Sequence, residues 1–435
     1  MKRSRLLFAL LTALLLGSCD RQDERTTLVI QRFFGECGAV YGSSVDVAKA
    51  ETECGIVTTI LNRFAAENPD INVKVNVVAW PGYPQLAAQI AAGDPPDLVT
   101  MHQSVISDYQ ARGLLSPIDD LMKGARIDPA ALTLAGQRGA VKDGRYFALP
   151  WDTIGRLWHI NTDLMAKAGL MANGKPMLPA SPEQLIAHAR KFKAATGKPY
   201  LIQAQVSAPD YLVANLYTYL LAQDADIFPD SRHIRLNTPQ AREIISMYRT
   251  LNTEQLTATG QDFPGATASF TNGQGGIFPT GTWMIGPYEE ASKLAGSKLR
   301  GYAVLPFPTL WGKSAAFVDG HAWVVPTDNR PAPERQAIAR FLGFITQYNK
   351  DWVRTGHLPA FRAVLDAPSF TAQPHRSDIA AMAATGQQLP GYVQRQSAIQ
   401  GLIGEELEAA VTGIKPVDAA LADAERRVNE LLAQM

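Results

Sequence analysis

The sequence predicts a two-lobed α/β protein, and three observations lead to this prediction. The chain has 435 residues, which is long for one hydrophobic core and suits two lobes of ordinary domain size. Up to residue 101 it alternates strand-like and helix-like segments. After about residue 145 the same alternation resumes without an internal repeat or a low-complexity linker. We therefore expect two lobes, each a mainly parallel sheet flanked by helices.

The first lobe is predicted from five segments in the order β-α-β-α-β. In the first helical segment, Ile56, Ile60 and Phe64 recur at helical spacing, and Pro69 ends it. The order is typical of a parallel, doubly wound sheet. The segments are the strand 26–34, the helix 54–68, the strand 71–78, the helix 83–92 and the strand 97–101.

The second half of the chain gives clear helix starts and short strands. Ser181 is placed to cap a helix that has Pro182 at its first position. Because strands and helices alternate to the end, we expect the chain to pass between the lobes more than once. The predicted strands are 146–150, 156–161, 275–278, 302–305 and 322–326, and the predicted helices are 162–169, 182–196, 210–223, 239–251, 333–349 and segments from about 392 to 432.

The N-terminus predicts export. Lys2, Arg3 and Arg5 precede an apolar run over residues 6–16, and small residues follow it, which is the pattern of a secretory signal. At about 1.5 Å per residue this run is too short for a bilayer core of about 30 Å. The alternative is a short buried helix.

The end of this leader resembles a bacterial lipobox. The residues are Leu16, Gly17, Ser18 and Cys19, and the resemblance implies a signal peptide over 1–18 and a lipid-modified Cys19. Several acyl chains would anchor the protein stably. Asp20 follows directly, which in enterobacterial lipoproteins marks retention at the inner membrane. We therefore expect a periplasmic protein anchored by lipid, with the inner membrane favoured.

Charge and cysteine content narrow the function further. Lys+Arg and Asp+Glu both number 41, so no basic surplus supports nucleic-acid binding. Loss of residues 1–18 removes three cations and no acid, leaving 38 against 41, or −3. Of the three cysteines, Cys37 and Cys54 remain after lipidation.

An exported chain can keep a disulfide between Cys37 and Cys54. Closing a loop of about 18 residues would stabilise the fold by roughly 3 kcal/mol. The alternative is a pair of unpaired buried thiols. A metal site is weaker, because two cysteines without a nearby histidine are an incomplete ligand set; we expect no metal and no cofactor.

Common catalytic motifs are incomplete. Residues 169–175 have phosphate-loop spacing, but Pro176 replaces the required hydroxyl residue. Gly312-Lys313-Ser314 ends a similar motif, yet Phe307 stands where its first glycine belongs. HExxH, CxxC and GxSxG do not occur in the sequence. The sequence therefore lacks the minimum parts of a phosphate loop, a zinc protease, a zinc ribbon or an α/β-hydrolase.

Five segments, spread over nearly the whole chain, carry a family resemblance. They are 93–99 (GDPPDLV), 148–152 with 157–169 (ALPWD and LWHINTDLMAKAG), 270–283 (FTNGQGGIFPTGTW), 305–308 (LPFP) and 356–360 (GHLPA). In this order they resemble the extracellular solute-binding proteins of carbohydrate ABC importers, the maltose/trehalose-binding-protein-like family.

The resemblance implies a monomer with the periplasmic binding protein fold. Such a protein is not an enzyme: it closes on a sugar in a cleft between its lobes. It would deliver the sugar to the subunits of an inner-membrane ABC permease. The implied lobes are 19–152 plus about 318–360, and about 153–317 plus 361–435. An α-linked glucoside such as trehalose or maltose is the expected ligand.

Aromatic side chains are the first candidates for contact with a sugar, because sugars offer flat C–H faces as well as hydroxyls. The family positions of Trp283 and Trp151 imply stacking platforms. Trp80 precedes Pro81-Gly82 in a loop, and Gly281 lies beside Trp283. For Trp158, Trp311 and Trp352, packing in the core is the favoured interpretation.

Polar candidates lie where strands end or where the chain changes lobe. His102 and Gln103 follow a strand at its carboxyl end, where α/β sheets place ligands, and Phe34 and Glu36 end the first strand. Asp152 is expected to accept sugar hydroxyls; its alternatives are a helix cap or a surface charge.

The last candidates come from the later part of the chain. The resemblance implies that the chain recrosses at Asp319, Gly320 and His321, where glycine allows close approach to a ligand or serves a turn. Arg362 matches a position that donates to hydroxyls, and its alternative is a solvated side chain. Tyr211 is a further candidate, beside Asp210 at the start of a helix.

Two other functions remain open. A secreted glycoside hydrolase of the retaining type needs two carboxyl groups about 5–5.5 Å apart, which Glu36 and Asp152 could supply, but no eight-fold β/α pattern accompanies them. A binding protein for a polyol or a glycerophosphodiester is the second alternative. The scarcity of clustered Arg and Lys around the candidate residues argues against a phosphate ligand.

Overall fold

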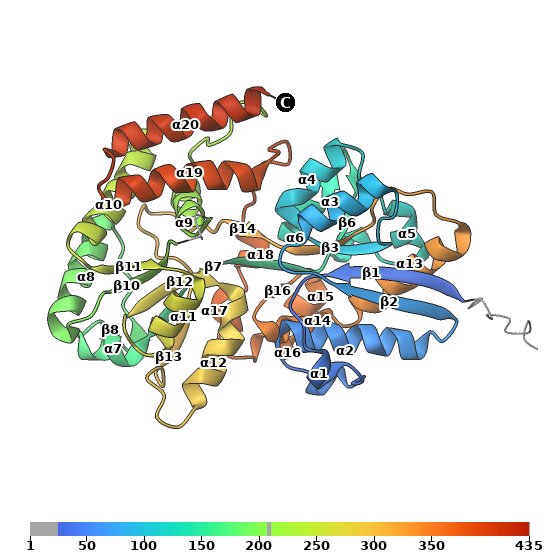
Figure 1. Ribbon diagram of the computed structural model, residues 1–435. Coiled ribbons are helices and arrows are strands. Elements are labelled where there is room, and N and C mark those ends of the chain that lie inside the picture. Colours follow the sequence, from blue (N-terminus) through green and yellow to red (C-terminus); the bar gives the residue numbers. More distant parts are fainter. Residues whose placement is uncertain (1–24, 207–209, 435) are drawn as a thin grey trace, which may run out of the picture.

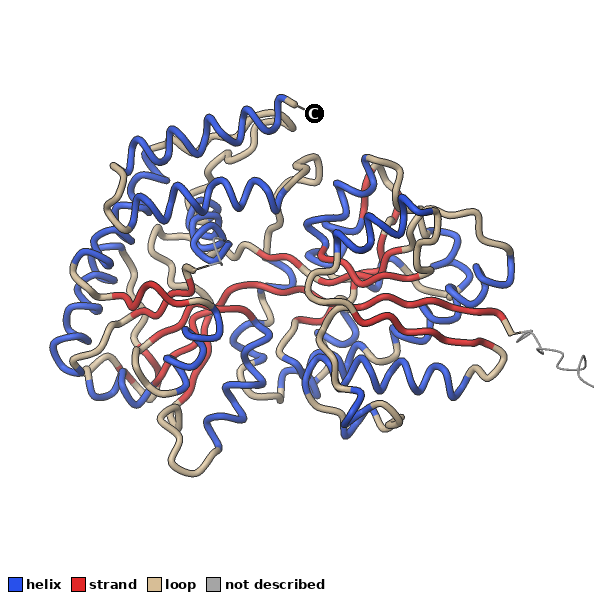
Figure 2. The backbone as a smooth tube through the Cα atoms, in the orientation of Figure 1, coloured by secondary structure: helices blue, strands red, loops and turns tan. Residues whose placement is uncertain are grey.

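Two β-sheets, one in each lobe, organise the molecule (Figure 1). The computed structural model describes residues 25–206 and 210–434. One sheet has five strands in the order β2-β1-β3-β15-β6, and the other has seven, with the order β11-β10-β12-β7-β13 and with β14 and β16 added on β7. Figure 2 shows the strands of both sheets meeting at the waist between the lobes. The predicted two-lobed α/β architecture is confirmed.

The first sheet contains the predicted β-α-β-α-β unit. Strand β1 pairs in parallel with β2 and β3, and the helices α2 and α3 connect them. Strand β15 runs antiparallel to its neighbours β3 and β6. The elements are β1 (Thr26–Arg32), α2 (Thr52–Glu67), β2 (Ile71–Val77), α3 (Tyr83–Ala92), β3 (Leu98–His102), β6 (Ala148–Pro150) and β15 (His321–Val324).

The second sheet is likewise parallel except for one strand. Strand β10 is parallel to β11 and β12, whereas β7 is antiparallel to β12 and β13. The exceptions, β7 and β15, enter directly from the other lobe and not through a helical crossover, so they run the opposite way. The strands are β7 (Asp152–Asn161), β10 (Leu201–Ala204), β11 (Thr257–Gln261), β12 (Ile277–Gly281) and β13 (Tyr302–Leu305).

Helices of the second lobe follow the predicted starts. The Ser181 hydroxyl accepts a hydrogen bond from the Gln184 N–H at 3.2 Å, so the predicted cap of α8 is confirmed. The last two helices, α19 and α20, pack beside α9 and α10 (Figure 1). The helices are α7 (Thr162–Lys167), α8 (Pro182–Thr196), α9 (Asp210–Leu221), α10 (Pro239–Thr253), α11 (Phe263–Thr271), α12 (Ile285–Lys293), α19 (Gln396–Val411) and α20 (Val417–Ala433).

In the first lobe, the predicted disulfide joins Cys37 to Cys54, with Cα atoms 6.1 Å apart. It ties the start of α1 to α2. No helix in the described residues combines the length and the apolar character needed to span a bilayer; the leader and Cys19 lie outside these residues. The other helices of this lobe are α1 (Gly38–Tyr41), α4 (Gln103–Ala111), α5 (Asp119–Gly124), α6 (Leu134–Ala140), α13 (Ala332–Thr346) and α14 (Asn349–Trp352).

The waist is built around the first residues of β7. Strands β14 (Val318–Asp319) and β16 (Leu358–Pro359) both pair with β7 there. An apolar cluster with members from both lobes, including Leu157 and Val353, fills the space beneath. Four one-turn helices of this region were not predicted, because a single turn shows no helical period: α15 (Arg362–Leu365), α16 (Pro368–Thr371), α17 (Arg376–Ile379) and α18 (Met382–Thr385).

Candidate functional site

The side chains that could serve a function form three groups. The hinge network lies at the waist and comprises Glu53, Asp152, His321, Trp352 and His357. The first-lobe group is an aromatic surface made of Phe34, Trp80 and His102. The second-lobe group consists of Arg156, Asp210, Tyr211 and Trp283.

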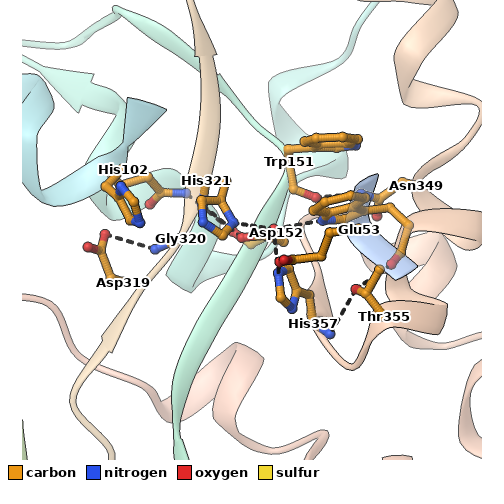
Figure 3. A network of polar contacts seen from close by, with 12 residues as sticks. Glu53, His102, Trp151, Asp152, Asp319, Gly320, His321, Asn349, Thr355 and His357 are labelled. Atoms are coloured by element: carbon orange, nitrogen blue, oxygen red, sulfur yellow. Dashed lines mark hydrogen bonds and ion pairs between the residues drawn. The ribbon is translucent and has the colours of Figure 1, made fainter. Parts of the chain in front are cut away.

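Asp152 is the centre of the hinge network (Figure 3). Its Oδ1 accepts the backbone N–H of His321 at 2.7 Å, and its Oδ2 accepts His321 Nδ1–H at 2.8 Å and Trp352 Nε1–H at 2.7 Å. The residue is completely buried. The carboxylate that was expected to accept sugar hydroxyls is therefore occupied by the protein's own donors in this structure.

The chain passes between the two lobes at three places, and all three meet at this carboxylate. Asp152 begins β7, His321 begins β15, and His357 directly precedes β16. His357 Nε2 lies 3.7 Å from Asp152 Oδ2 and 2.8 Å from Glu53 Oε1. The hinge network thus joins three segments at which the chain passes between the two sheets.

Electrostatics reinforce the Asp152–His321 pair. Burial raises the pKa of Asp152, but the charges of His321 and His357 and the hydrogen bonds from His321 outweigh it and lower the pKa to about 2. Burial lowers the pKa of His321, yet the charge and hydrogen bond of Asp152 raise it above its ordinary value. Below the raised pKa of His321, the two side chains therefore form a buried carboxylate–imidazolium pair.

Asp152, His321 and His357 are also the one set of metal-ligating side chains that converges within the described residues. Their ligand atoms lie within 4.8 Å of one another. However, Asp152 Oδ2 already accepts N–H bonds from His321 and Trp352. A metal ion would have to displace both donors. The network therefore suits a protonated histidine better than a metal ion.

Trp151 does not offer a free face in this structure. Its ring stacks on Trp352, with centroids 3.9 Å apart and planes inclined by 14°, and only 1% of the residue is exposed. Trp323 covers it from another side, with centroids 5.3 Å apart. The turn after β6 directs this side chain into the core of the first lobe, which the loop position in the sequence does not reveal.

Gln103 and Asp319 also hold the chain together. Buried Gln103 donates through Nε2 to the Asp152 carbonyl at 3.3 Å. Asp319 Oδ1 accepts the backbone N–H groups of Ser104 and Gly320 at 3.0 and 2.8 Å, and Oδ2 accepts the Ser104 hydroxyl at 2.6 Å. Both side chains therefore stabilise the segments of the chain that meet at the waist.

Gly320 is required by a chain crossing. A Cβ atom there would overlap the Asp152 carbonyl oxygen and the Gln103 amide. The sequence analysis expected this glycine to allow close approach to a ligand or to serve a turn. In the structure it allows close approach to the protein's own backbone.

Replacing Gly320 with alanine is therefore expected to destabilise the fold. Overpacking of this kind costs about 1–3 kcal/mol, because neither backbone at the crossing can move freely. Thermal unfolding followed by circular dichroism measures the loss. Gly401→Ala is the control, since nothing lies within 4 Å of a Cβ at this position in α19. Equal melting temperatures for both variants would contradict the close crossing.

The first-lobe group begins with Phe34, two residues after the end of β1. Its φ is +81°, which is unusual for a bulky residue. Residues with such strained backbone angles are often found at functional sites. The ring meets those of His321 and Trp352 edge-on, each with centroids 5.0 Å apart. Glu36 is exposed and accepts the Gly38 N–H at 2.8 Å; it shares no described contact with Asp152, as a hydrolytic pair would require.

Trp80 and His102 extend this aromatic surface. Trp80 is 71% exposed, and its ring meets that of His102 edge-on, with centroids 5.8 Å apart. Burial, helped by the charge of His321, lowers the pKa of His102 to about 3, so the ring is neutral. Tyr83 Oη accepts the His102 backbone N–H at 2.9 Å and lies 2.6 Å from Nδ1. Two hydrogen bonds therefore join Tyr83 to His102 and fix the orientation of the imidazole.

In the second lobe, Trp283 is half-buried in a short turn after β12. A side chain at Gly281 would overlap its ring, so the glycine leaves room for the indole at the end of the strand. The guanidinium of Arg156 lies 3.6 Å above the Tyr211 ring and 5.2 Å from the Trp283 ring. The structure thus brings together three of the predicted residues: Tyr211, Gly281 and Trp283.

Arg156 was missed by the sequence analysis. The available signal was a cation within β7, a strand whose other residues are all buried. Asp152 and Arg156 are four residues apart on one face of β7, which corresponds to about 13 Å along the strand. Arg362 does not join any group: it is exposed and donates through Nε to the Leu132 carbonyl at 3.0 Å.

Comparisons with known proteins agree on the class of protein. Residues 51–347 match the family model described as bacterial extracellular solute-binding protein. The putative ABC transporter periplasmic-binding protein YcjN of Escherichia coli K12 is 23% identical over 372 residues, which cover 83% of this chain and 79% of that protein. The sn-glycerol-3-phosphate-binding periplasmic protein UgpB of the same strain is 24% identical over 405 residues, covering 86% and 89%.

Solved structures show the same fold. The cyclic alpha-maltosyl-1,6-maltose binding protein of Arthrobacter globiformis superposes with a TM-score of 0.75 at 19% identity, covering 94% of this chain and 100% of that chain. UgpB of Mycobacterium tuberculosis, in complex with glycerophosphocholine, superposes with a TM-score of 0.72 at 17% identity, covering 86% and 94%.

The family match covers more than half of the chain, and the neighbours share the two-lobed fold. The members of the family bind solutes and are not enzymes, which excludes the hydrolase alternative. The chain belongs to the family of bacterial extracellular solute-binding proteins.

Proposed function

We propose that the protein binds a neutral sugar between the first-lobe and second-lobe groups and delivers it to an inner-membrane ABC permease. The observation that most directly supports this proposal is the second-lobe group, where the Trp283 and Tyr211 rings flank an Arg156–Asp210 pair without net charge. Aromatic faces with a few fixed polar groups suit a sugar, which combines C–H faces with hydroxyls. No cofactor is needed for this function.

Charge favours a sugar over a glycerophosphodiester. A phosphate needs surplus positive charge or a bidentate arginine. In the described candidate groups, Arg156 is the cation closest to the Trp283 and Tyr211 rings. Asp210 neutralises its charge, with Oδ2 2.5 Å from Arg156 Nη2. A glycerophosphodiester remains the second candidate, because UgpB of M. tuberculosis was solved with glycerophosphocholine.

Dimensions favour a disaccharide. The second-lobe group lies about 13 Å along β7 from the hinge, and the first-lobe group touches the hinge through Phe34 and His321. A ligand of two sugar rings, such as trehalose or maltose, would reach both groups when the lobes close. We place the lobes at 19–152 plus about 318–360, and at about 153–317 plus 361–435.

Calorimetry on the purified domain tests the function. The panel contains glucose, maltose, trehalose, glycerol 3-phosphate and glycerophosphocholine, and product analysis accompanies each titration. We expect a disaccharide to bind, to remain chemically unchanged, and to shift X-ray scattering toward a more compact particle. Binding of the phosphates alone would replace the sugar with the second candidate, and turnover of a glycoside would end the binding-protein proposal.

We also propose that Cys19 carries lipid and anchors a monomer in the periplasm, with Asp20 favouring the inner membrane. Anchor and ligand groups are far apart in the chain, so Cys19→Ser should release the protein from membranes without changing its ligand affinity. Fractionation without detergent measures the release. A variant that stays in the membrane fraction would contradict lipidation.

A further inference from the structure

We infer that Arg156 and Asp210 act as a joint specificity element: Arg156 donates to one hydroxyl of the ligand, Asp210 accepts from a neighbouring hydroxyl, and Asp210 excludes anionic ligands. This inference rests on the proposed function, because it assigns the class of ligand to the same site. It names a neutral compound with adjacent hydroxyls.

Arg156 is held rigidly in place. Its side chain is 10% exposed, and Nη2 lies 2.5 Å from Asp210 Oδ2. The guanidinium plane has the Tyr211 ring 3.6 Å away and the Trp283 ring 5.2 Å away. A planar donor fixed by an ion pair and by aromatic faces loses little freedom when a ligand binds, which favours affinity.

One donor of this arginine is unused. Nη1 is buried and has no hydrogen-bond partner among the described residues. Buried donors are nearly always satisfied, and an unpaired one beside aromatic rings indicates an acceptor that arrives with the ligand. A hydroxyl or ring oxygen supplies that acceptor.

Asp210 offers the complementary acceptor. Its side chain is 45% exposed, and the described hydrogen bond to it reaches Oδ2, so the carboxylate can accept from a hydroxyl of the ligand. Sugars carry hydroxyls on adjacent carbons that can accept from Arg156 and donate to Asp210 at once. A phosphate can only accept, and it would face the negative charge of Asp210.

Three variants separate the two roles. Arg156→Met removes the cation and its donors, Arg156→Lys keeps the charge without the planar fork, and Asp210→Asn keeps the shape without the negative charge. Arg190→Met is the matched control, because Arg190 forms an exposed pair with Glu254 on another part of the same lobe. Each protein is titrated by calorimetry with the sugar that wild type binds and with glycerol 3-phosphate, which is anionic, and a melting curve verifies the fold.

We expect sugar affinity to fall by about ten- to a hundredfold in Arg156→Met and Asp210→Asn, the range for a hydrogen bond to a charged group. Arg156→Lys should lose sugar affinity and still reject glycerol 3-phosphate. Asp210→Asn should gain at least about tenfold in affinity for glycerol 3-phosphate, since Arg156 is then uncompensated. The control should bind as wild type does.

Unchanged sugar affinity in both Arg156 variants would overturn the donor role, and an Asp210→Asn protein that still rejects glycerol 3-phosphate would overturn the exclusion role. Both results leave the proposed function intact, because wild type binds sugar in each. A wild type that binds no sugar overturns the proposed function itself, and the inference with it.

Discussion

Replacing Trp283 with alanine is expected to lower the affinity for the sugar by about 30- to 1000-fold. A buried aromatic platform contributes on the order of 2–4 kcal/mol as a binding hot spot, and each 1.4 kcal/mol is about tenfold in affinity. Trp283 is half-buried, and its ring lies against Gly281 and 5.2 Å from the Arg156 guanidinium. Calorimetry with the wild-type ligand measures the loss.

Two further variants show whether the ring itself is responsible. Trp283→Phe keeps a smaller aromatic face and should lose less affinity than alanine. Gly281→Ala should displace the indole, because its Cβ would occupy the place of the ring, and should reduce affinity while leaving Trp283 in the chain. If Trp283→Ala binds the ligand as tightly as wild type, the second-lobe group is not the ligand site.

Much of the fold could be predicted, because local patterns determine its regular elements. Helical spacing identified α2, and the Ser181-Pro182 start identified α8. The one-turn helices between residues 362 and 385 were not found, since packing at the waist, and not a local pattern, determines them.

The site was less predictable, because loop position does not tell which way a side chain points. Trp151 and Trp283 both lie at strand ends, yet one is stacked inside the core and the other is half-buried beside Arg156. Arg156 itself was missed because its partner Asp210 is 54 residues away. The hinge network could not be foreseen for the same reason: it joins Asp152 to His321, 169 residues later.

Asp152→Ala is expected to destabilise the folded state by about 3–5 kcal/mol, the cost of leaving one partner of a buried charged pair without the other. His321 Nδ1, the His321 backbone N–H and Trp352 Nε1 would all lose their acceptor in a buried environment. Asp152→Asn should be milder, because the amide oxygen can still accept while the NH₂ group faces donors. Urea denaturation at pH 6 measures both, with Asp94→Asn as an exposed control.

The pH dependence of wild type should identify the charged pair as the cause. The pKa of Asp152 falls from its ordinary 3.8 to about 2 in the folded state, so its contribution is present above pH 3.8 and is lost as the pH falls from 3.8 toward 2. The pKa of His321 is raised above its ordinary 6.5, so its contribution is present below pH 6.5 and is lost as the pH rises through the folded value. The stability difference between wild type and Asp152→Asn should therefore be largest between about pH 4 and 6.5 and should shrink on both sides. A difference that stays constant from pH 3 to pH 9 would show that the carboxylate acts through shape alone and that the hinge holds no ion pair.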